Sequence, residues 1–144
     1  MFAEDLYEIA ATTMEELCFL FSLPEPVDDE NERKEFIVAQ VDFVGPVNGY
    51  LKVQAQKQLL PILTSNMLGQ TDFTEQQQFD ALGEVTNVIC GNILPRISDS
   101  RSVFNIHAPV VAAGEKSCID VHDTEKAVPI YFDEGEICVR LFYQ

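Results

Sequence analysis

Hydrophobic residues recur at spacings of three and four along three segments of the chain, a pattern that predicts three amphipathic helices. The first predicted helix covers residues 2 to 21, and the second covers residues 57 to 68. The third begins after Asp72 or Thr74, either of which can cap it, and runs to about Ile97. Pro24 and Pro26 follow the first segment and Gly69 follows the second, whereas Pro95 is expected to kink or end the third near its last turn.

Runs rich in β-branched and aromatic residues separate and follow the helices. They predict strands at residues 36–44, 49–55, 103–106, 110–113, 117–121, 128–132 and 137–142. The first two strands are joined through a turn at residues 45–48, and the last two through Asp133-Glu134-Gly135. This order predicts an α+β fold of one domain, residues 1–144. An antiparallel sheet would pack with three helices in two layers, or in three if helices cover both faces.

The third predicted helix carries polar residues opposite its hydrophobic stripe. At about 100° per residue, Asp80, Glu84, Asn87 and Gly91 align on the solvent side, and we call these four residues the polar row. A polar row is also what an ordinary solvated helix face presents. Gly91 favours a functional reading, because glycine inside a helix costs roughly 0.5–1 kcal/mol relative to alanine. We therefore expect something to approach this face closely, and Gly83 lies beside it.

The charge of the chain narrows the classes of partner. Its 144 residues carry a formal net charge of −15, which repels nucleic-acid backbones and anionic membranes alike. No run of about 18 apolar residues predicts a membrane span. The start of the chain is acidic where a secretory signal would be basic, so we expect a cytoplasmic protein. An acidic stretch at residues 24–34 fits a solvated loop better than the alternative, an acidic binding patch.

The cysteines and histidines do not form a metal motif. The four cysteines lie far apart without a CxxC pair, and each is expected to be a small buried residue rather than a metal ligand or a disulfide partner. His107 and His122 are isolated from them and from each other. No phosphate-binding glycine loop or GxSxG elbow occurs either, so we predict no metal site and no nucleophilic hydrolase site.

The first helix echoes the third when the sequence is shifted by 76 residues. Glu4, Glu8 and Ala11 then align with the first three residues of the polar row. Separately, residues 49–53 resemble residues 135–139. Two readings stay open, chance similarity between short segments and an internal pseudo-symmetry of the fold. Under the second reading the polar row exists twice, but only the second copy has the amide, because Ala11 takes its place.

The spacing of the polar row resembles a known family. Asp80-x3-Glu84-x2-Asn87, followed 22 positions later by Pro109, is similar to the pattern of the CheC/CheX family of chemotaxis phosphatases, specifically its single-site CheX-like branch. The resemblance covers roughly residue 36 to the C-terminus. Its context comprises Gly45-x3-Gly49-x-Leu51, Met67-Leu68-Gly69 and Gly91-Asn92.

The resemblance implies a phosphatase that acts on the aspartyl phosphate of a response-regulator receiver domain. Asn87 would orient the attacking water, and Glu84 would pair with the receiver's phosphate-site lysine. Asp80, Gly91 and Pro109 would belong to the contact with the receiver. The chain would need no cofactor of its own, because the magnesium ion would sit on the receiver.

The resemblance also implies a homodimer with strands paired between subunits. Two alternatives to a phosphatase stay open. The same fold could be a binding module that holds a receiver domain or a flagellar switch component without catalysis. Alternatively, the chain could be an unrelated α+β domain whose polar row is only a solvated face.

Overall fold

The computed structural model describes residues 2–26, 35–98, 101, 103–114 and 126–144. Its elements follow one another in the order helix, two strands, two helices and four strands. They are α1 (Phe2–Cys18), β1 (Phe36–Val44), β2 (Gly49–Gln56), the 3-10 turn η1 (Lys57–Leu59), α2 (Leu60–Leu68), α3 (Glu75–Ile97), β3 (Asn105–Ile106), β4 (Val110–Gly114), β5 (Lys126–Phe132) and β6 (Gly135–Tyr143).

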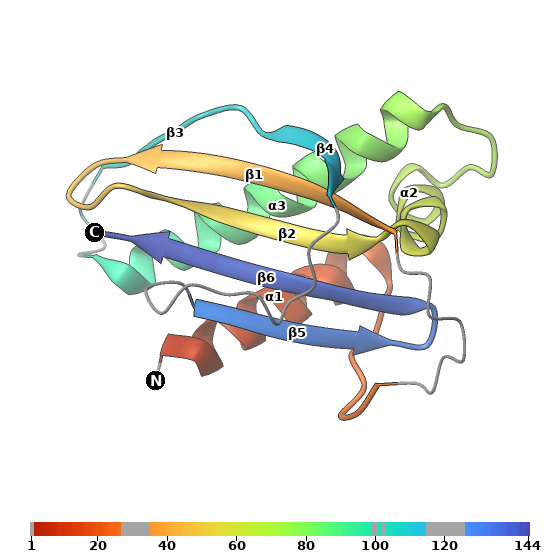
Figure 1. Ribbon diagram of the computed structural model, residues 1–144, viewed down its shortest axis with the longest axis horizontal. Helices are drawn as coiled ribbons and strands as arrows, with labels where there is room; N and C mark the ends of the chain where they lie inside the picture. Colours follow the sequence, from red (N-terminus) through yellow and green to blue (C-terminus); the bar gives the residue numbers. More distant parts are fainter. Residues whose placement is uncertain (1, 27–34, 99–100, 102, 115–125) are drawn as a thin grey trace.

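The described strands form one antiparallel sheet with the order β3-β1-β2-β6-β5, and β4 also pairs with β1. Helices α1 and α3 pack against one another and cross one face of this sheet (Figure 1). The chain therefore has the predicted α+β architecture of an antiparallel sheet packed with three helices. The central strands β2 and β6 are each the second strand of a hairpin. This order is what two related halves would produce, although the pseudo-symmetry itself stays a prediction.

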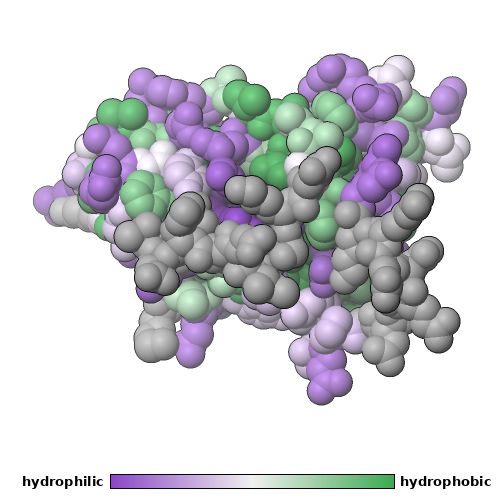
Figure 2. Space-filling model, in the orientation of Figure 1, coloured by the Kyte–Doolittle hydropathy of each residue, from purple (hydrophilic) through white to green (hydrophobic). Residues whose placement is uncertain are grey.

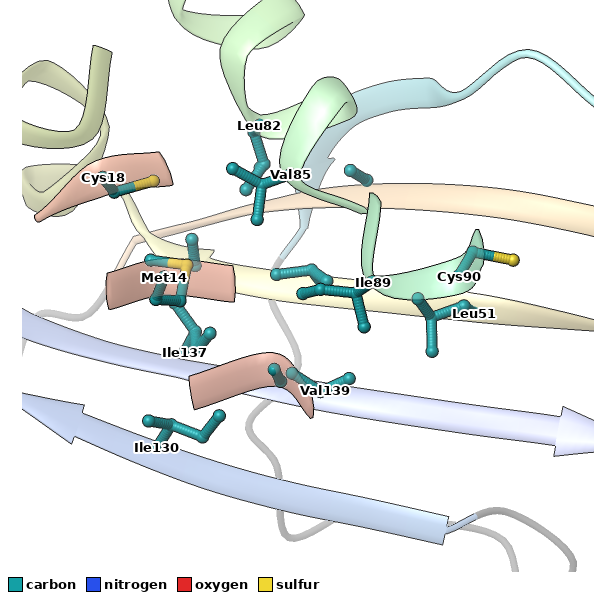
Figure 3. Packing of buried hydrophobic residues seen from close by; sticks show 14 of the residues in the cluster. Met14, Cys18, Leu51, Leu82, Val85, Ile89, Cys90, Ile130, Ile137 and Val139 are labelled. Carbon is teal, nitrogen blue, oxygen red and sulfur yellow. The ribbon is translucent and has the colours of Figure 1, made fainter. Parts of the chain in front are cut away.

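The hydrophobic core lies between the helices and the sheet. Side chains on one face of the strands, such as Leu51, Ile137 and Val139, meet the buried faces of α1 and α3, where Met14 and Ile89 contribute (Figure 3). All five are nearly inaccessible to solvent. Because buried apolar area is the main stabilising term in folding, this contact fixes how each helix is rotated relative to the sheet.

The first helix is shorter than predicted. It ends at Cys18 rather than at residue 21, because Phe19 adopts a left-handed conformation with φ of 53°. The chain then reaches the edge of β5, where the Leu23 N–H donates to the Tyr131 carbonyl at 2.7 Å. Pairing with this strand replaces the last helical turn that the hydrophobic spacing had predicted.

Two other predictions differ from the structure, and two fall wholly or mostly outside the residues that it describes. The predicted 57–68 helix begins with the 3-10 turn η1, and Gly69 ends it with a φ of 69°. The predicted 103–106 strand is reduced to β3, because only Asn105 and Ile106 pair with β1. The predicted strand at 117–121 and most of the acidic stretch at 24–34 lie outside the described residues.

The cysteines divide into two groups. Cys18 and Cys90 are free and buried, as predicted. Cys138 is disulfide-bonded, so the prediction is wrong for this residue. Along β6 the core residues Ile137 and Val139 face the helices, and Cys138 between them faces the other side of the sheet.

The two buried thiols predict an alkaline loss of stability. Burial disfavours the thiolate and raises the pKa of both Cys18 and Cys90 from 9.0 to about 12. The folded chain therefore holds these protons where the unfolded chain releases them. The free energy of unfolding should fall as the pH rises from 9 to about 12.

Urea unfolding across this pH range would measure the effect. A Cys18→Ala/Cys90→Ala variant should show a shallower fall than the parent chain. An equal slope in the two proteins would contradict the assignment.

Candidate functional site

The helix that carries the polar row begins at a well-formed cap. The Thr74 hydroxyl accepts from the Gln77 N–H at 3.1 Å, and the Gln77 side chain accepts from the Thr74 N–H at 2.8 Å. This reciprocal pair is a capping box, which satisfies two backbone donors that the first turn would leave unpaired. Of the two predicted caps, the structure uses Thr74. The helix then continues for 23 residues, through Pro95, to Ile97.

The buried side of α3 sets the direction of the polar row. Leu82, Val85 and Ile89 point into the core in Figure 3 and are almost fully buried. The helix is thus held along the sheet by one apolar face, and the opposite face must look outward. The orientation of the row therefore follows from core packing rather than from contacts of the polar residues themselves.

The polar row lies on the outer side of α3, as the periodicity predicts. Asp80 and Glu84 are exposed, and Asn87 is half-buried. The Gln76 amide donates to Asp80 Oδ1 at 2.8 Å. Within the described part of the chain, neither Glu84 nor Asn87 has a side-chain hydrogen bond or an ion pair. A carboxylate and an amide, three positions apart on a helix, therefore stand available to an external group.

Gly91 leaves open space at the end of the row. It is exposed, and a Cβ added there would meet nothing within 4 Å. No packing contact inside the described chain therefore requires glycine at this position. Glycine lowers the stability of the helix here, and no contact within the described chain explains its presence.

Gly91→Ala is expected to raise the free energy of unfolding by about 0.5–1 kcal/mol, because alanine favours the helix and its methyl group meets no neighbour. Urea unfolding would measure the change. Gly83→Ala is the matched control on the same helix, because its methyl group does meet neighbours and should offset the gain. Equal stabilisation by both substitutions would show that the surroundings of the two glycines do not differ as described.

Gly83 has a different role from the one that the sequence suggests. A Cβ added at Gly83 would lie 3.2 Å from Pro109 Cγ and 3.5 Å from Val111 Cγ2. The glycine therefore admits the chain segment around Pro109 against α3, directly beside Glu84 in the helix. Gly83 and Pro109 are far apart in sequence, so no local pattern could have revealed this contact.

The segment that carries Pro109 is anchored to the sheet at both ends. The His107 N–H donates to the Asp42 carbonyl at 2.9 Å, and Val110 pairs with Gln40 in the register of β4 and β1. Pro109 itself is exposed. The structure thus brings Pro109 to the flank of the polar row and holds it there by backbone pairing.

The other side of this segment faces a shallow cavity of about 310 Å³ at the sheet edge. It lies between β1, at Val38 and Gln40, and the segment that includes Ala108 and Val110. Figure 2 shows hydrophobic residues gathered near this edge, where β4 lies in Figure 1. The edge strand is therefore apolar on a surface that a monomer would leave exposed.

Helix α1 presents a similar arrangement without the amide. Glu4 and Glu8 are exposed and Ala11 is half-buried, which matches the exposure of the first three residues of the polar row. An ion pair of 3.0 Å between Arg96 and Asp5 ties α3 to the start of α1. The α1 face offers carboxylates but no side chain that both donates and accepts a hydrogen bond at the third position.

Among the described residues, no group of three or more histidine, cysteine, aspartate or glutamate side chains could hold a metal ion. No helix in the described ranges is long and apolar enough to cross a membrane.

Comparison with known proteins identifies the family. Residues 37–133 match the family described as chemotaxis phosphatase CheX. A comparison with curated proteins gave no match. Among solved structures, the chain is similar to a chemotaxis protein CheX from Desulfovibrio desulfuricans, with 26% identity, a TM-score of 0.76 and coverage of 99% of each chain.

Two more distant structures share the fold. The chemotaxis protein CheX from Vibrio vulnificus is 18% identical with a TM-score of 0.76, over 99% of this chain and 96% of that one. The CheX chain of a CheX-CheY-BeF3-Mg+2 complex from Borrelia burgdorferi is 18% identical with a TM-score of 0.71, over 100% of this chain and 98% of that one. Because the match covers most of the chain, the protein belongs to the CheX family of chemotaxis phosphatases.

Proposed function

We propose that this chain hydrolyses the aspartyl phosphate of a response-regulator receiver domain, and that the polar row of α3 carries the reaction. One observation carries the proposal. Glu84 and Asn87 stand on the outer face of a long, capped helix, with no partner in the described chain. The complex of a CheX protein with CheY in the Borrelia structure supports a receiver domain as the partner.

The reaction needs little covalent chemistry from the chain. Water attacks phosphorus in line with the aspartyl oxygen, the bond between phosphorus and that oxygen breaks, and aspartate carboxylate and inorganic phosphate result. Catalysis then rests on positioning the water and on managing charge. The Asn87 amide can accept from or donate to this water without adding negative charge beside the phosphate.

Glu84 has the complementary task of holding the receiver. Its exposed carboxylate can accept a charge-assisted hydrogen bond from a lysine at the receiver's phosphate site. Asp80 would lie at the edge of the contact, and Gly91 would leave room for the receiver's backbone. The magnesium ion would belong to the receiver, so the chain itself would supply no metal ligand.

Each chain would have one catalytic site. If the fold is pseudo-symmetric, α1 is the counterpart of α3, and Glu8 stands where α3 has Glu84. Ala11 cannot orient water, so the α1 face would lack the central group of the reaction. The matching exposure of the two helices supports this account.

We also propose that two copies of the chain pair through the sheet edge. Strand β4 contains no charged residue, and Val110 is among its exposed side chains. Exposed apolar edge strands are usually protected by pairing or by charge. Pairing with a second copy would protect this edge.

Two separate measurements test the function. Binding of the chain to a phosphorylated receiver, and release of phosphate from that receiver, should be followed independently. The proposal expects both saturable binding and faster phosphate release. Binding without faster release would assign the chain to the alternative class of receiver-binding modules, and absence of both would contradict the proposal.

Gly83→Ala is expected to slow phosphate release about fivefold, equivalent to about 1 kcal/mol, because the new methyl group displaces Pro109 from the flank of the polar row. A double-mutant cycle with Pro109→Ala tests whether Gly83→Ala acts by displacing Pro109, because alanine lacks the Cγ that the new methyl group meets. The Gly83→Ala effect should shrink toward zero in the Pro109→Ala background. An unchanged effect would show that Gly83 does not act through Pro109.

A further inference from the structure

Two phenylalanines after α1 are exposed to solvent. Phe19 and Phe21 are 63% and 62% exposed, whereas Leu20 between them is buried. By contrast, Phe43 and Phe132 are fully buried in the core. Two exposed phenylalanines so close in the sequence are unusual on a monomer surface and often mark a contact with another molecule.

The backbone of Phe19 makes this position more unusual. Its φ of 53° lies in the left-handed region, which bulky residues adopt at a cost. Gly69, at the end of α2, shows the residue type that normally occupies such a helix end, with a φ of 69°. The Phe19 ring is mostly exposed, so packing within the chain compensates little of this cost.

The two rings are surrounded by apolar side chains and by negative charge. The Asn66 amide donates to the Cys18 carbonyl at 2.7 Å, so the C-terminal ends of α1 and α2 meet. Leu68, the last residue of α2, is 46% exposed at this end. Neither helix has a basic residue in its last turn, and Glu15 and Glu16 are exposed in the last turn of α1. Two helix C-termini add partial negative charge to that of the carboxylates.

We propose that Phe19, Phe21 and Leu68 form a docking surface for a partner protein segment that presents apolar side chains among lysines or arginines. The apolar part would meet the rings, and the basic part would meet Glu15, Glu16 and the helix ends. Charge argues against the other occupants. A second copy would bring the same negative rim, and an anionic bilayer would be repelled by a chain of net charge −15.

This surface is independent of the proposed phosphatase site, because none of its residues belongs to the polar row or to the Pro109 segment. The docking proposal can therefore fail while the proposed function holds, and the proposed function can fail while the docking proposal holds. The effect of Phe19 on docking can also be separated from any effect on the stability of the fold. Phe19→Gly removes the ring and relieves the left-handed strain, so this variant should unfold at a higher temperature than the parent chain.

The test uses a synthetic amphipathic helical peptide of leucine and lysine, about 18 residues long, or about five turns. Binding should be saturable, and Phe19→Gly/Phe21→Ser should weaken it at least about tenfold. Val103→Ser, which removes an 85% exposed valine elsewhere, is the matched control and should leave affinity unchanged. A peptide with serine in place of leucine should bind at least about tenfold more weakly, since charge alone lacks the apolar contact.

Equal affinity of the parent chain and the double variant would overturn the proposal, as would absence of saturable binding to the leucine-lysine peptide. Two other results would reassign the surface and also overturn it. One is a lower molecular mass of the double variant in sedimentation, which would indicate a second copy. The other is binding to phosphatidylserine vesicles that the double variant loses, which would indicate a membrane.

Discussion

Replacing Asn87 by alanine is expected to lower the rate of phosphate release from a phosphorylated receiver at least about tenfold, which corresponds to about 1.4 kcal/mol or more. The loss follows from the proposed role of the amide. It holds water in line with the bond that breaks, and the alanine methyl group can neither donate nor accept. Asn87 is only half-buried on the outer face of α3, so its removal should leave the fold intact.

Two further variants make this experiment specific. Asn87→Asp keeps the size of the side chain but adds a negative charge near the phosphate, so it should not restore the rate. Asn92→Ala removes an exposed amide from the same helix, on the side that faces α1, and should keep the parent rate. If Asn87→Ala and Asn92→Ala released phosphate at the same rate as the parent chain, Asn87 would have no catalytic role.

Replacing Glu84 by alanine is expected to weaken binding of the phosphorylated receiver at least about tenfold, in addition to slowing phosphate release. The carboxylate is proposed to anchor a lysine, so its loss leaves a positive charge of the receiver unpaired. Titration of the receiver at two salt concentrations would measure the change. The parent affinity should fall with added salt more steeply than that of the variant, because screening acts on the charge pair.

Glu8→Ala supplies the matched control for Glu84. It removes an exposed glutamate from α1, at the position that would correspond to Glu84 if the fold is pseudo-symmetric, and Ala11 leaves no amide beside it to complete a site. The parent affinity and rate should both persist in this variant. Equal losses in Glu84→Ala and Glu8→Ala would point to general loss of negative charge rather than to a specific anchor.

The elements of the fold were largely predictable, because their signals are local. Hydrophobic spacing and caps placed α3 and gave the outward direction of Glu84 and Asn87, since both depend on periodicity within one helix. The hairpin between β1 and β2 was likewise predictable from its turn residues, and the Gly45 N–H does bond to Asn48 Oδ1 at 3.2 Å. Features that depend on residues close together in the sequence can therefore be predicted from short stretches of it.

The remaining features depend on contacts between distant segments. The end of α1 moves to Cys18 because Leu23 pairs with β5, and that strand lies more than a hundred residues further along the chain. The sequence placed Gly83 only beside the polar row, but its role depends on Pro109. Sequence periodicity cannot report which distant segment packs against a helix, so these contacts required the structure.

The central claim is that the chain turns over phosphorylated receivers through Asn87, and a turnover count tests it most directly. A phosphorylated receiver in large molar excess would be mixed with the chain, and the phosphate released above the receiver's own spontaneous loss would be counted per chain. The account predicts many phosphates per parent chain and at least about tenfold slower release with Asn87→Ala. Release no faster than the spontaneous rate, from a receiver that the chain demonstrably binds, would contradict it.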